Sequence, residues 1–243
     1  MSAAQPDDGR SEPAAQPERA AAEWWEDPNL PWKHKPTRTD IACFTWLSVV
    51  AVYSIVISVL RPTLAGLAPH VLASLGSWTG LVLVGAQARV GDPWWPLVWV
   101  LGTFGLIKFD WIYWWAGRLW GRELIDVWSG RSERVRRANA RAERLARKYD
   151  VLAIAVGFLP LPIPRGVILA VLGETGTSLR KFLTVSFVCS VITNGAYLAL
   201  GYQIGEPAVQ VMNAYGGYLV WVSVALVVVL IGQAYWRQSR RSA

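Results

Sequence analysis

The sequence predicts an all-α, polytopic membrane protein with about four transmembrane helices and two opposed re-entrant helical hairpins. Composition is the first reason, because 53% of the 243 residues are hydrophobic and only 17% are charged, whereas an average soluble domain has about 25% charged residues. The second is that several uncharged stretches reach the roughly 20 residues that a helix needs to cross a hydrocarbon core of about 30 Å. The third is that Lys and Arg gather between these stretches, as they do in cytoplasmic loops.

The same composition excludes several other classes of protein. The net charge of +7 would suit nucleic acid only if the basic residues shared a folded, soluble face, so we expect no nucleic-acid partner. Cys43 and Cys189 lie within apolar runs and give no disulfide framework. His34 and His70 have no partner at metal-ligand spacing, and no Walker A loop or H-E-x-x-H pattern occurs. We therefore expect no metal and no cofactor, and the protein is not predicted to be an enzyme.

The first element is a tail and not a helix. Residues 1–40 are rich in Ala, Pro and charged residues without apolar periodicity, and they predict a disordered cytoplasmic tail. The uncharged residues 41–60 then predict the first span. Further spans are predicted at residues 94–116, 182–200 and 218–235, and residues 237–243 predict a basic cytoplasmic C-terminus.

Two other apolar segments predict re-entrant hairpins. Residues 151–173 are interrupted by Pro160, Pro162 and Pro164, which leaves arms of about nine residues, each about 13 Å long if helical. Basic residues flank this segment on both sides, so it should enter and leave on the cytoplasmic face. Residues 71–90 are interrupted by glycines and flanked by few charges, which suits the opposite face, although a tilted span would also fit.

The membrane domain, residues 41–236, is thus predicted to contain two units of hairpin followed by span in opposite orientations. Transporters built in this way place a site near the membrane midplane. Here the repeat is inferred from hydropathy alone, and both termini then lie in the cytoplasm. Between the two units, residues 134–149 form a basic amphipathic pattern, which fits a helix on the anionic inner leaflet or a solvated connector equally well.

The segment Pro160-Leu161-Pro162-Ile163-Pro164-Arg165-Gly166 is the first candidate for a functional site. Irregular backbone at membrane depth is tolerated only where protein buries it or where it lines a wet cavity. A half-helix that starts near Gly166 directs its free N–H groups and positive dipole end at the break, and Arg165 adds a permanent charge. This combination predicts a phosphate site, although Arg165 could instead pair with a carboxylate for packing.

The second candidate is one face of a helix. Asp110, Tyr113, Gly117 and Gly121 share this face because they are three or four residues apart. The two glycines permit the close approach of another helix. A carboxylate is costly in lipid, so Asp110 should face the interior, where it would serve as a proton relay or as the partner of Arg165.

Two further charges lie near these segments. Lys108 faces away from Asp110 on a helix, so we expect its ammonium group to reach toward the membrane surface. Glu174 closes the second half-helix and is a candidate for the same cavity as Arg165, although residues 175–177 resemble a turn near the surface.

These residues resemble those of the DedA family, the bacterial branch of the VTT-domain, SNARE-associated Golgi protein superfamily. The likeness covers about residues 41–236 and rests on three motifs, carried by Asp110, Tyr113, Gly117 and Gly121; by Phe158, Pro160, Arg165 and Gly173; and by Gly201, Tyr202 and Gly205. Gly157 departs from the pattern, because the family usually has its first arginine there.

The resemblance implies a multi-pass protein of the bacterial inner membrane that moves a phosphate-bearing lipid between leaflets, as a flippase or scramblase. Undecaprenyl phosphate and glycerophospholipids are the expected substrates. The expected partners are therefore membrane lipids, with protons as a second candidate, and a homo-oligomer is left open. The expected substrate-binding residues are Arg165, Asp110, Tyr113, Pro160, Pro164, Gly166 and Glu174. The expected helix-packing residues are Gly117, Gly121, Gly173, Gly201, Tyr202 and Gly205.

Two other functions stay open on the sequence alone. A proton-coupled transporter of small cations or osmolytes would depend on Asp110 and Glu174 more than on Arg165. An envelope assembly factor without transport activity would tolerate substitution of both Arg165 and Asp110.

Overall fold

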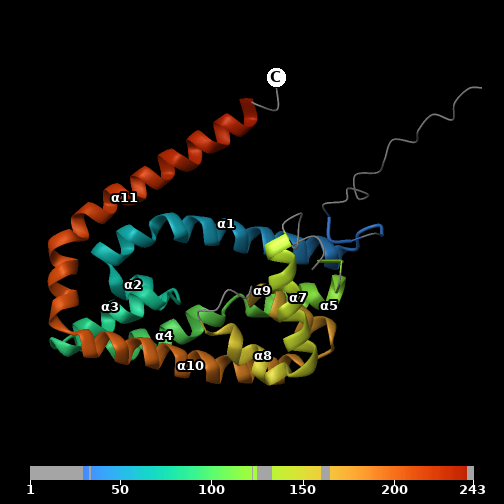
Figure 1. The fold of residues 1–243 in the computed structure, drawn as a ribbon, viewed down its shortest axis with the longest axis horizontal. Coiled ribbons are helices and arrows are strands. Elements are labelled where there is room, and N and C mark those ends of the chain that lie inside the picture. Colours follow the sequence, from blue (N-terminus) through green and yellow to red (C-terminus); the bar gives the residue numbers. More distant parts are fainter. Residues whose placement is uncertain (1–29, 33, 122, 125–132, 160–164, 240–243) are drawn as a thin grey trace, which may run out of the picture.

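The structure is a computed structural model that describes residues 30–32, 34–121, 123–124, 133–159 and 165–239 (Figure 1). Every regular element in these residues is an α-helix, which confirms the predicted fold class. The helices are α1 (Arg38–Leu67), α2 (Pro69–Ser74), α3 (Trp78–Arg89), α4 (Trp95–Ile107), α5 (Asp110–Trp120), α7 (Glu133–Lys148), α8 (Asp150–Gly157), α9 (Arg165–Glu174), α10 (Leu179–Ile204) and α11 (Glu206–Ser239). Among them, α1, α10 and α11 are long and apolar enough to cross a membrane.

The predicted second span, residues 94–116, is interrupted. Its two parts, α4 and α5, have 13 and 11 residues, and neither reaches the length of about 20 residues that a span requires. At the break, the Lys108 ammonium donates to the Tyr53 hydroxyl (2.6 Å) and to the Leu75 carbonyl (3.2 Å). The expectation that Lys108 reaches toward the membrane surface is therefore wrong, because its charge finds polar partners within the protein.

The two hairpins lie toward opposite ends of the molecule. Helices α1 and α10 and the α4–α5 pair run lengthwise, with α2 and α3 near one end and α8 and α9 near the other (Figure 1). These helix pairs coincide with the predicted hairpins at residues 71–90 and 151–173. Their re-entrant position in a bilayer stays a prediction, and residues 160–164, which connect α8 to α9, lie outside the described part.

The two halves of the chain share a sequence motif. Asp110, Tyr113, Gly117 and Gly121 recur 84 residues later as Asn194, Tyr197, Gly201 and Gly205. In both copies the last glycine ends its helix, with φ of 51° at Gly121 and 62° at Gly205, a conformation that side chains disfavour. The hairpin-and-span repeat that hydropathy predicts is therefore accompanied by a repeat in the sequence.

Each motif helix crosses the second helix of a hairpin, α5 against α9 and α10 against α3. A Cβ atom at Gly117 would overlap the backbone of α9, and one at Gly173 would overlap the backbone of α5. Gly85 of α3 and Gly201 of α10 make the equivalent contacts. Such small residues let helix backbones approach closely. Each hairpin thus packs on the motif helix of the other unit.

The segment before α1 differs from the predicted tail. Residues 1–29 lie outside the described part, but Trp32 is only 3% exposed and its ring lies 5.7 Å from that of Trp120. Thr37 and Asp40 form a capping box at the start of α1, and Asp40 also accepts a hydrogen bond from Trp120 Nε1 (2.9 Å). The predicted tail extends too far, because these contacts tie the last ten or so of its residues to α5.

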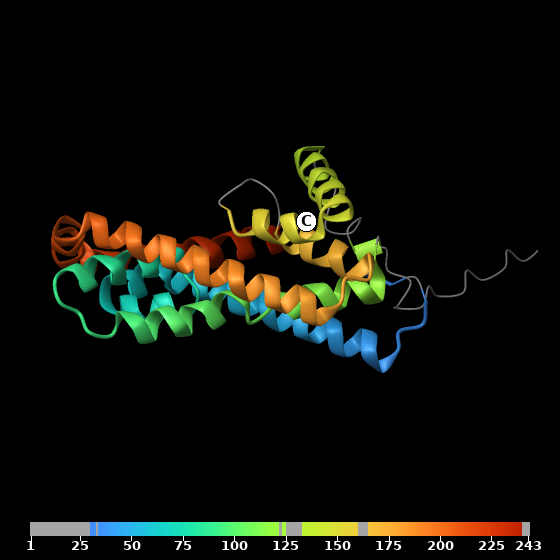
Figure 2. The same cartoon turned by 90° about the horizontal axis from the view of Figure 1, so that it is seen from below.

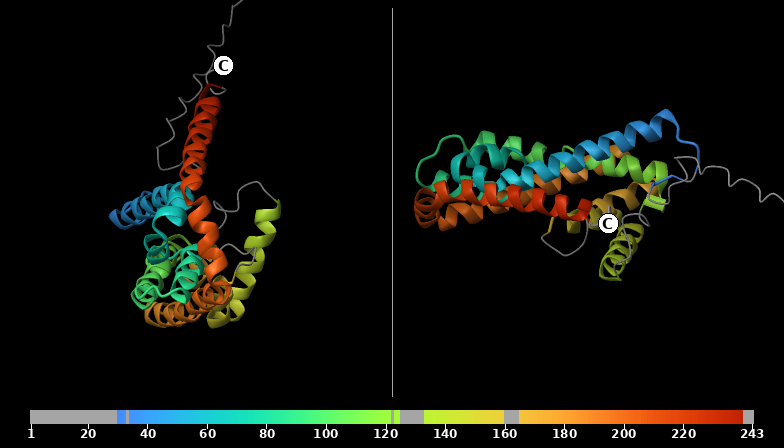
Figure 3. Two further views of the ribbon diagram at one scale, coloured as in Figure 1. Left: turned by 90° about the vertical axis from the view of Figure 1, so that its left-hand side faces the viewer. Right: turned by 90° about the horizontal axis from the view of Figure 1, so that it is seen from above.

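The basic helix and the last helix extend away from the others. Helix α7 forms where the basic amphipathic pattern predicts it, and it projects from the other helices (Figure 2). Helix α11 begins well before the predicted span at residues 218–235, and its C-terminal part extends past the remaining helices (Figure 3). It contacts α1 next to Pro62, a proline inside that helix, because the Thr63 N–H donates to Ser223 Oγ (3.2 Å).

Candidate functional site

The Arg165 guanidinium and the Asp110 carboxylate form an ion pair. Arg165 is the first residue of α9, and Asp110 is the first residue of α5. The two helices also touch at Gly117 and Gly173, seven and eight residues further on, so they run side by side in the same direction. Two helix N-termini with positive dipole ends therefore meet at the pair.

The pair is shielded from solvent, and one nitrogen of its guanidinium has no hydrogen-bond partner among the described residues. The side chain of Asp110 is 7% exposed and that of Arg165 is 21% exposed, and the Arg165 Cζ atom lies 4.0 Å from the centroid of the Phe158 ring. The Arg165 Nε atom is buried and has no hydrogen-bond partner among the described residues. Within the described part of the chain, the guanidinium therefore has a donor available for an additional acceptor, and guanidinium groups bind phosphate oxygens well.

Two of the other predicted substrate-binding residues, Tyr113 and Gly166, lie on the helices that carry the pair. Tyr113 lies one turn after Asp110 and packs against the hydrophobic cluster that contains Phe158, and Gly166 is the second residue of α9. Pro160 and Pro164 lie outside the described residues.

Glu174 is placed away from the pair, at the opposite end of α9. There it accepts a hydrogen bond from Arg147 (2.8 Å), which also contacts Glu143 (3.1 Å). These hydrogen bonds raise the pKa of the Arg147 guanidinium above its ordinary value, with the bond to Glu174 as the largest cause. The structure thus brings Arg165, Asp110 and Tyr113 together but does not bring Glu174 to them, and a binding role for Glu174 stays a prediction.

The predicted helix-packing residues lie at helix crossings and helix ends. Gly117, Gly173 and Gly201 occupy the two close crossings, and Gly121 and Gly205 end their helices. Tyr202 is half exposed, and its hydroxyl accepts a hydrogen bond from Arg89 (3.4 Å). It therefore lies at the surface of the α3–α10 crossing.

A family model for the VTT domain matches residues 71–203, more than half of the chain. The chain belongs to the VTT-domain family. This is the domain of the DedA and SNARE-associated Golgi proteins, which confirms the resemblance, and the family is membrane-associated and implicated in transport. No curated protein and no solved structure matched the chain. The matched region of this VTT protein includes both hairpins, the Arg165–Asp110 pair and nearly all of α10.

Sequence reasoning missed a row of polar residues inside the VTT domain. Ser186, Ser190 and Asn194 of α10 are each 0% exposed, and Thr103 of α4 is 3% exposed. Two signals in the sequence could have found them: their spacing of four residues within an apolar stretch, and the equivalence of Asn194 with Asp110.

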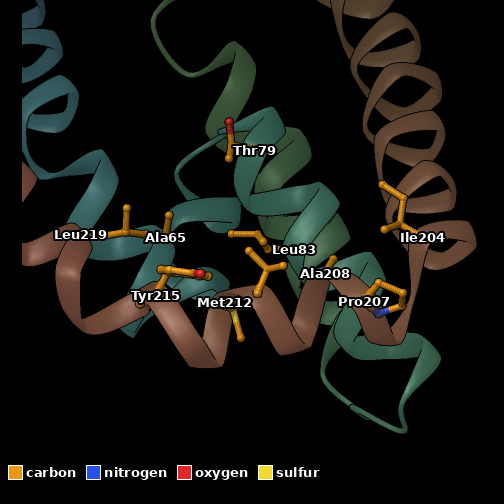
Figure 4. Close-up of a pocket in the computed structure, with 11 residues that line it drawn as sticks. Ala65, Thr79, Leu83, Ile204, Pro207, Ala208, Met212, Tyr215 and Leu219 are labelled. Atoms are coloured by element: carbon orange, nitrogen blue, oxygen red, sulfur yellow. The ribbon is translucent and has the colours of Figure 1, made fainter.

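An apolar groove lies in the other half of the molecule, among the end of α1, helix α3 and the start of α11 (Figure 4). Its volume is about 500 Å³. Leu83, Met212 and Leu219 are among the residues that line it. Val211 and Tyr215, which also line it, are 59% and 61% exposed, so the groove is open along one side.

Proposed function

We propose that this VTT-domain protein moves a phosphate-bearing lipid, such as undecaprenyl phosphate or a glycerophospholipid, between the leaflets of a bacterial inner membrane. The observation that carries this proposal is the shielded Arg165–Asp110 pair at two meeting helix N-termini, with Arg165 Nε unpartnered among the described residues. Both termini of the chain are proposed to be cytoplasmic, in agreement with the basic residues near them.

The proposed mechanism exchanges one anion for another at Arg165. A phosphate accepts hydrogen bonds from the guanidinium and from the free N–H groups at the start of α9. Asp110 then leaves the guanidinium or takes up a proton, because the site would otherwise hold two anions beside one cation. This exchange reduces the desolvation cost that otherwise prevents a charged headgroup from crossing the membrane. The lipid tails remain in apolar surroundings throughout.

The apolar groove favours a lipid over a small polar substrate. Its lining is almost entirely apolar and it is open along one side (Figure 4), so it suits a hydrocarbon chain. The alternative, a proton-coupled transporter of small cations or osmolytes, is supported by one observation, the shielded carboxylate of Asp110.

Leaflet exchange of labelled lipids in liposomes that contain the purified protein tests the proposal. Labelled undecaprenyl phosphate and a labelled phospholipid are compared in the wild type, Arg165→Ala, Arg165→Lys and Asp110→Asn. The matched control is Lys181→Gln, because Lys181 is a cation in an exposed ion pair with Asp150 (2.6 Å). We expect Arg165→Ala to remove accelerated exchange, Arg165→Lys to retain part of it and Lys181→Gln to retain all of it.

Wild-type exchange by folded Arg165→Ala would contradict the assignment of the anion site. No acceleration by the folded wild type would favour the cation transporter, for which Asp110→Asn should abolish proton-coupled uptake while Arg165→Lys retains it.

A further inference from the structure

Asn194 is a buried amide of α10. Its side chain is 0% exposed, and neither Oδ1 nor Nδ2 has a hydrogen-bond partner among the described residues. An amide that is buried in an apolar interior without hydrogen-bond partners loses its hydrogen bonds to water and gains none in return. A site of this kind is therefore expected to hold a molecule that both donates and accepts hydrogen bonds.

The sequence repeat gives Asn194 a structural counterpart. Asn194 occupies the motif position of Asp110, seven residues before the glycine of the crossing, and α10 crosses α3 as α5 crosses α9. Asn194 lies inside its helix, whereas Asp110 begins one. On the α3 side, the Trp78 ring stacks on Tyr197, with centroids 5.1 Å apart and planes 13° apart. Trp78 Nε1 is also buried without a partner in the described part of the chain. This half of the molecule thus has a buried amide at the motif position of Asp110 and a buried indole stacked on the motif tyrosine, Tyr197.

The polar row of α10 extends from Asn194 toward the ion pair. Ser190 Oγ donates to the Thr103 carbonyl (3.0 Å), whereas Ser186 Oγ is buried with no partner among the described residues. Cys189, in the same part of α10, packs against the hydrophobic cluster that contains Phe158. The Arg165 guanidinium lies over the ring of that phenylalanine. The row therefore borders the Arg165 site at one end and reaches Asn194 at the other.

We infer that Asn194 is the centre of a second, uncharged half-site that binds a hydroxyl group, supplied by water or by a lipid headgroup. The amide is suited to this ligand, because Nδ2–H donates to the hydroxyl oxygen while Oδ1 accepts from its proton. Ser186 Oγ and Trp78 Nε1 supply further polar atoms along α10 and α3. The inference goes beyond the proposed transport activity, since the half-site can be occupied whether or not lipid is moved.

Cysteine accessibility tests the half-site without measuring transport. In a Cys43→Ser, Cys189→Ser background, Asn194→Cys and Ser186→Cys are treated in liposomes with a small, water-soluble methanethiosulfonate reagent. The control is Ile192→Cys, because Ile192 lies on the same helix and is 66% exposed, where lipid would surround it. We expect Asn194→Cys to react at least ten times faster than Ile192→Cys. If Asn194→Cys does not fold, Ser186→Cys, a nearly isosteric change about two turns earlier on α10, shows whether water reaches the same row of buried polar residues.

The lipid composition distinguishes the two sources of the hydroxyl group. Slower reaction in phosphatidylglycerol than in phosphatidylcholine liposomes would identify a headgroup hydroxyl as the occupant, and equal rates would identify water. Reaction of folded Asn194→Cys and Ser186→Cys no faster than that of Ile192→Cys would show a dry interior and overturn the inference.

Discussion

Arg165 and Asp110 place a full charge of each sign in a shielded position, and each compensates the other. Removing one partner from such a pair leaves an uncompensated charge, whereas replacing both by apolar residues of similar volume is often neutral. Substitutions can therefore distinguish two contributions of the pair. Its contribution to folding requires that the two side chains match each other, and its contribution to function requires the guanidinium.

The stability of paired and unpaired variants follows from this argument. Arg165→Met and Asp110→Leu alone should each lower the free energy of unfolding by about 3–5 kcal/mol, and the double variant should recover most of the loss. Thermal unfolding in detergent measures the effect. Equal, additive losses in the double variant would show that the two charges do not depend on each other.

Charge decided which site residues the sequence could predict. Arg165 and Asp110 stand out because a charge within an apolar run needs a reason, and the structure brings them together. Lys108 is equally visible, but its partners, Tyr53 of α1 and Leu75 just after α2, come from distant parts of the chain that no local spacing indicates. Asn194 escaped notice because the site was predicted from charged residues within apolar runs, and an amide carries no charge.

At the scale of helices, close crossings of small residues set the distances on which the ion pair depends. Gly117→Ala in α5 adds a methyl group against the backbone of α9 and should cost about 1–3 kcal/mol through overpacking. Gly217→Ala in α11 is the matched control, because nothing lies within 4 Å of its added Cβ and alanine favours a helix by up to about 1 kcal/mol. Thermal unfolding of both variants tests this. Equal effects would contradict a close α5–α9 crossing.

The exposed pair between α8 and α10 predicts a modest pH dependence. The hydrogen bond from Lys181 (2.6 Å) is the largest cause that lowers the pKa of Asp150. The folded pKa is therefore below the unfolded value of about 3.9, so the pair stabilises the fold above that pH and its contribution is lost as the pH falls through the folded pKa.

Asp150→Asn should accordingly lower stability near pH 7 by less than about 1 kcal/mol, since both side chains are partly exposed, and should have no effect well below the folded pKa. Unfolding of the variant and the wild type across pH measures the difference. A difference that persists in acid would show that Asp150 stabilises the protein by other means.

Element positions were easier to predict than their interruptions. Residues 41–60 and 182–200 lie within α1 and α10, and the proline-rich segment separates α8 from α9. The break between α4 and α5 was not predicted, because residues 94–116 contain neither a proline nor a glycine at the break. The partners that stabilise it come from α1 and from the residue after α2.

At the scale of the whole molecule, each hairpin packs on the motif helix of the other half. Hydropathy predicted two units in opposite orientations but not this exchange of partners, because packing between distant segments depends on glycine backbone contacts that hydropathy does not record. The exchange places the ion pair where α5 packs on α9, and the buried amide of Asn194 in α10, which packs on α3. The two sites are thus related by the repeat and differ in charge.

The measurement that tests the central claim most directly is lipid exchange by the apolar double variant, Arg165→Met with Asp110→Leu, in liposomes that contain labelled undecaprenyl phosphate. This variant separates folding from function, because it removes both charges without leaving either unpaired. The account predicts a folded protein with most of the thermal stability of the wild type and no acceleration of exchange above empty liposomes. Wild-type exchange by this folded variant would contradict the claim that Arg165 binds the headgroup.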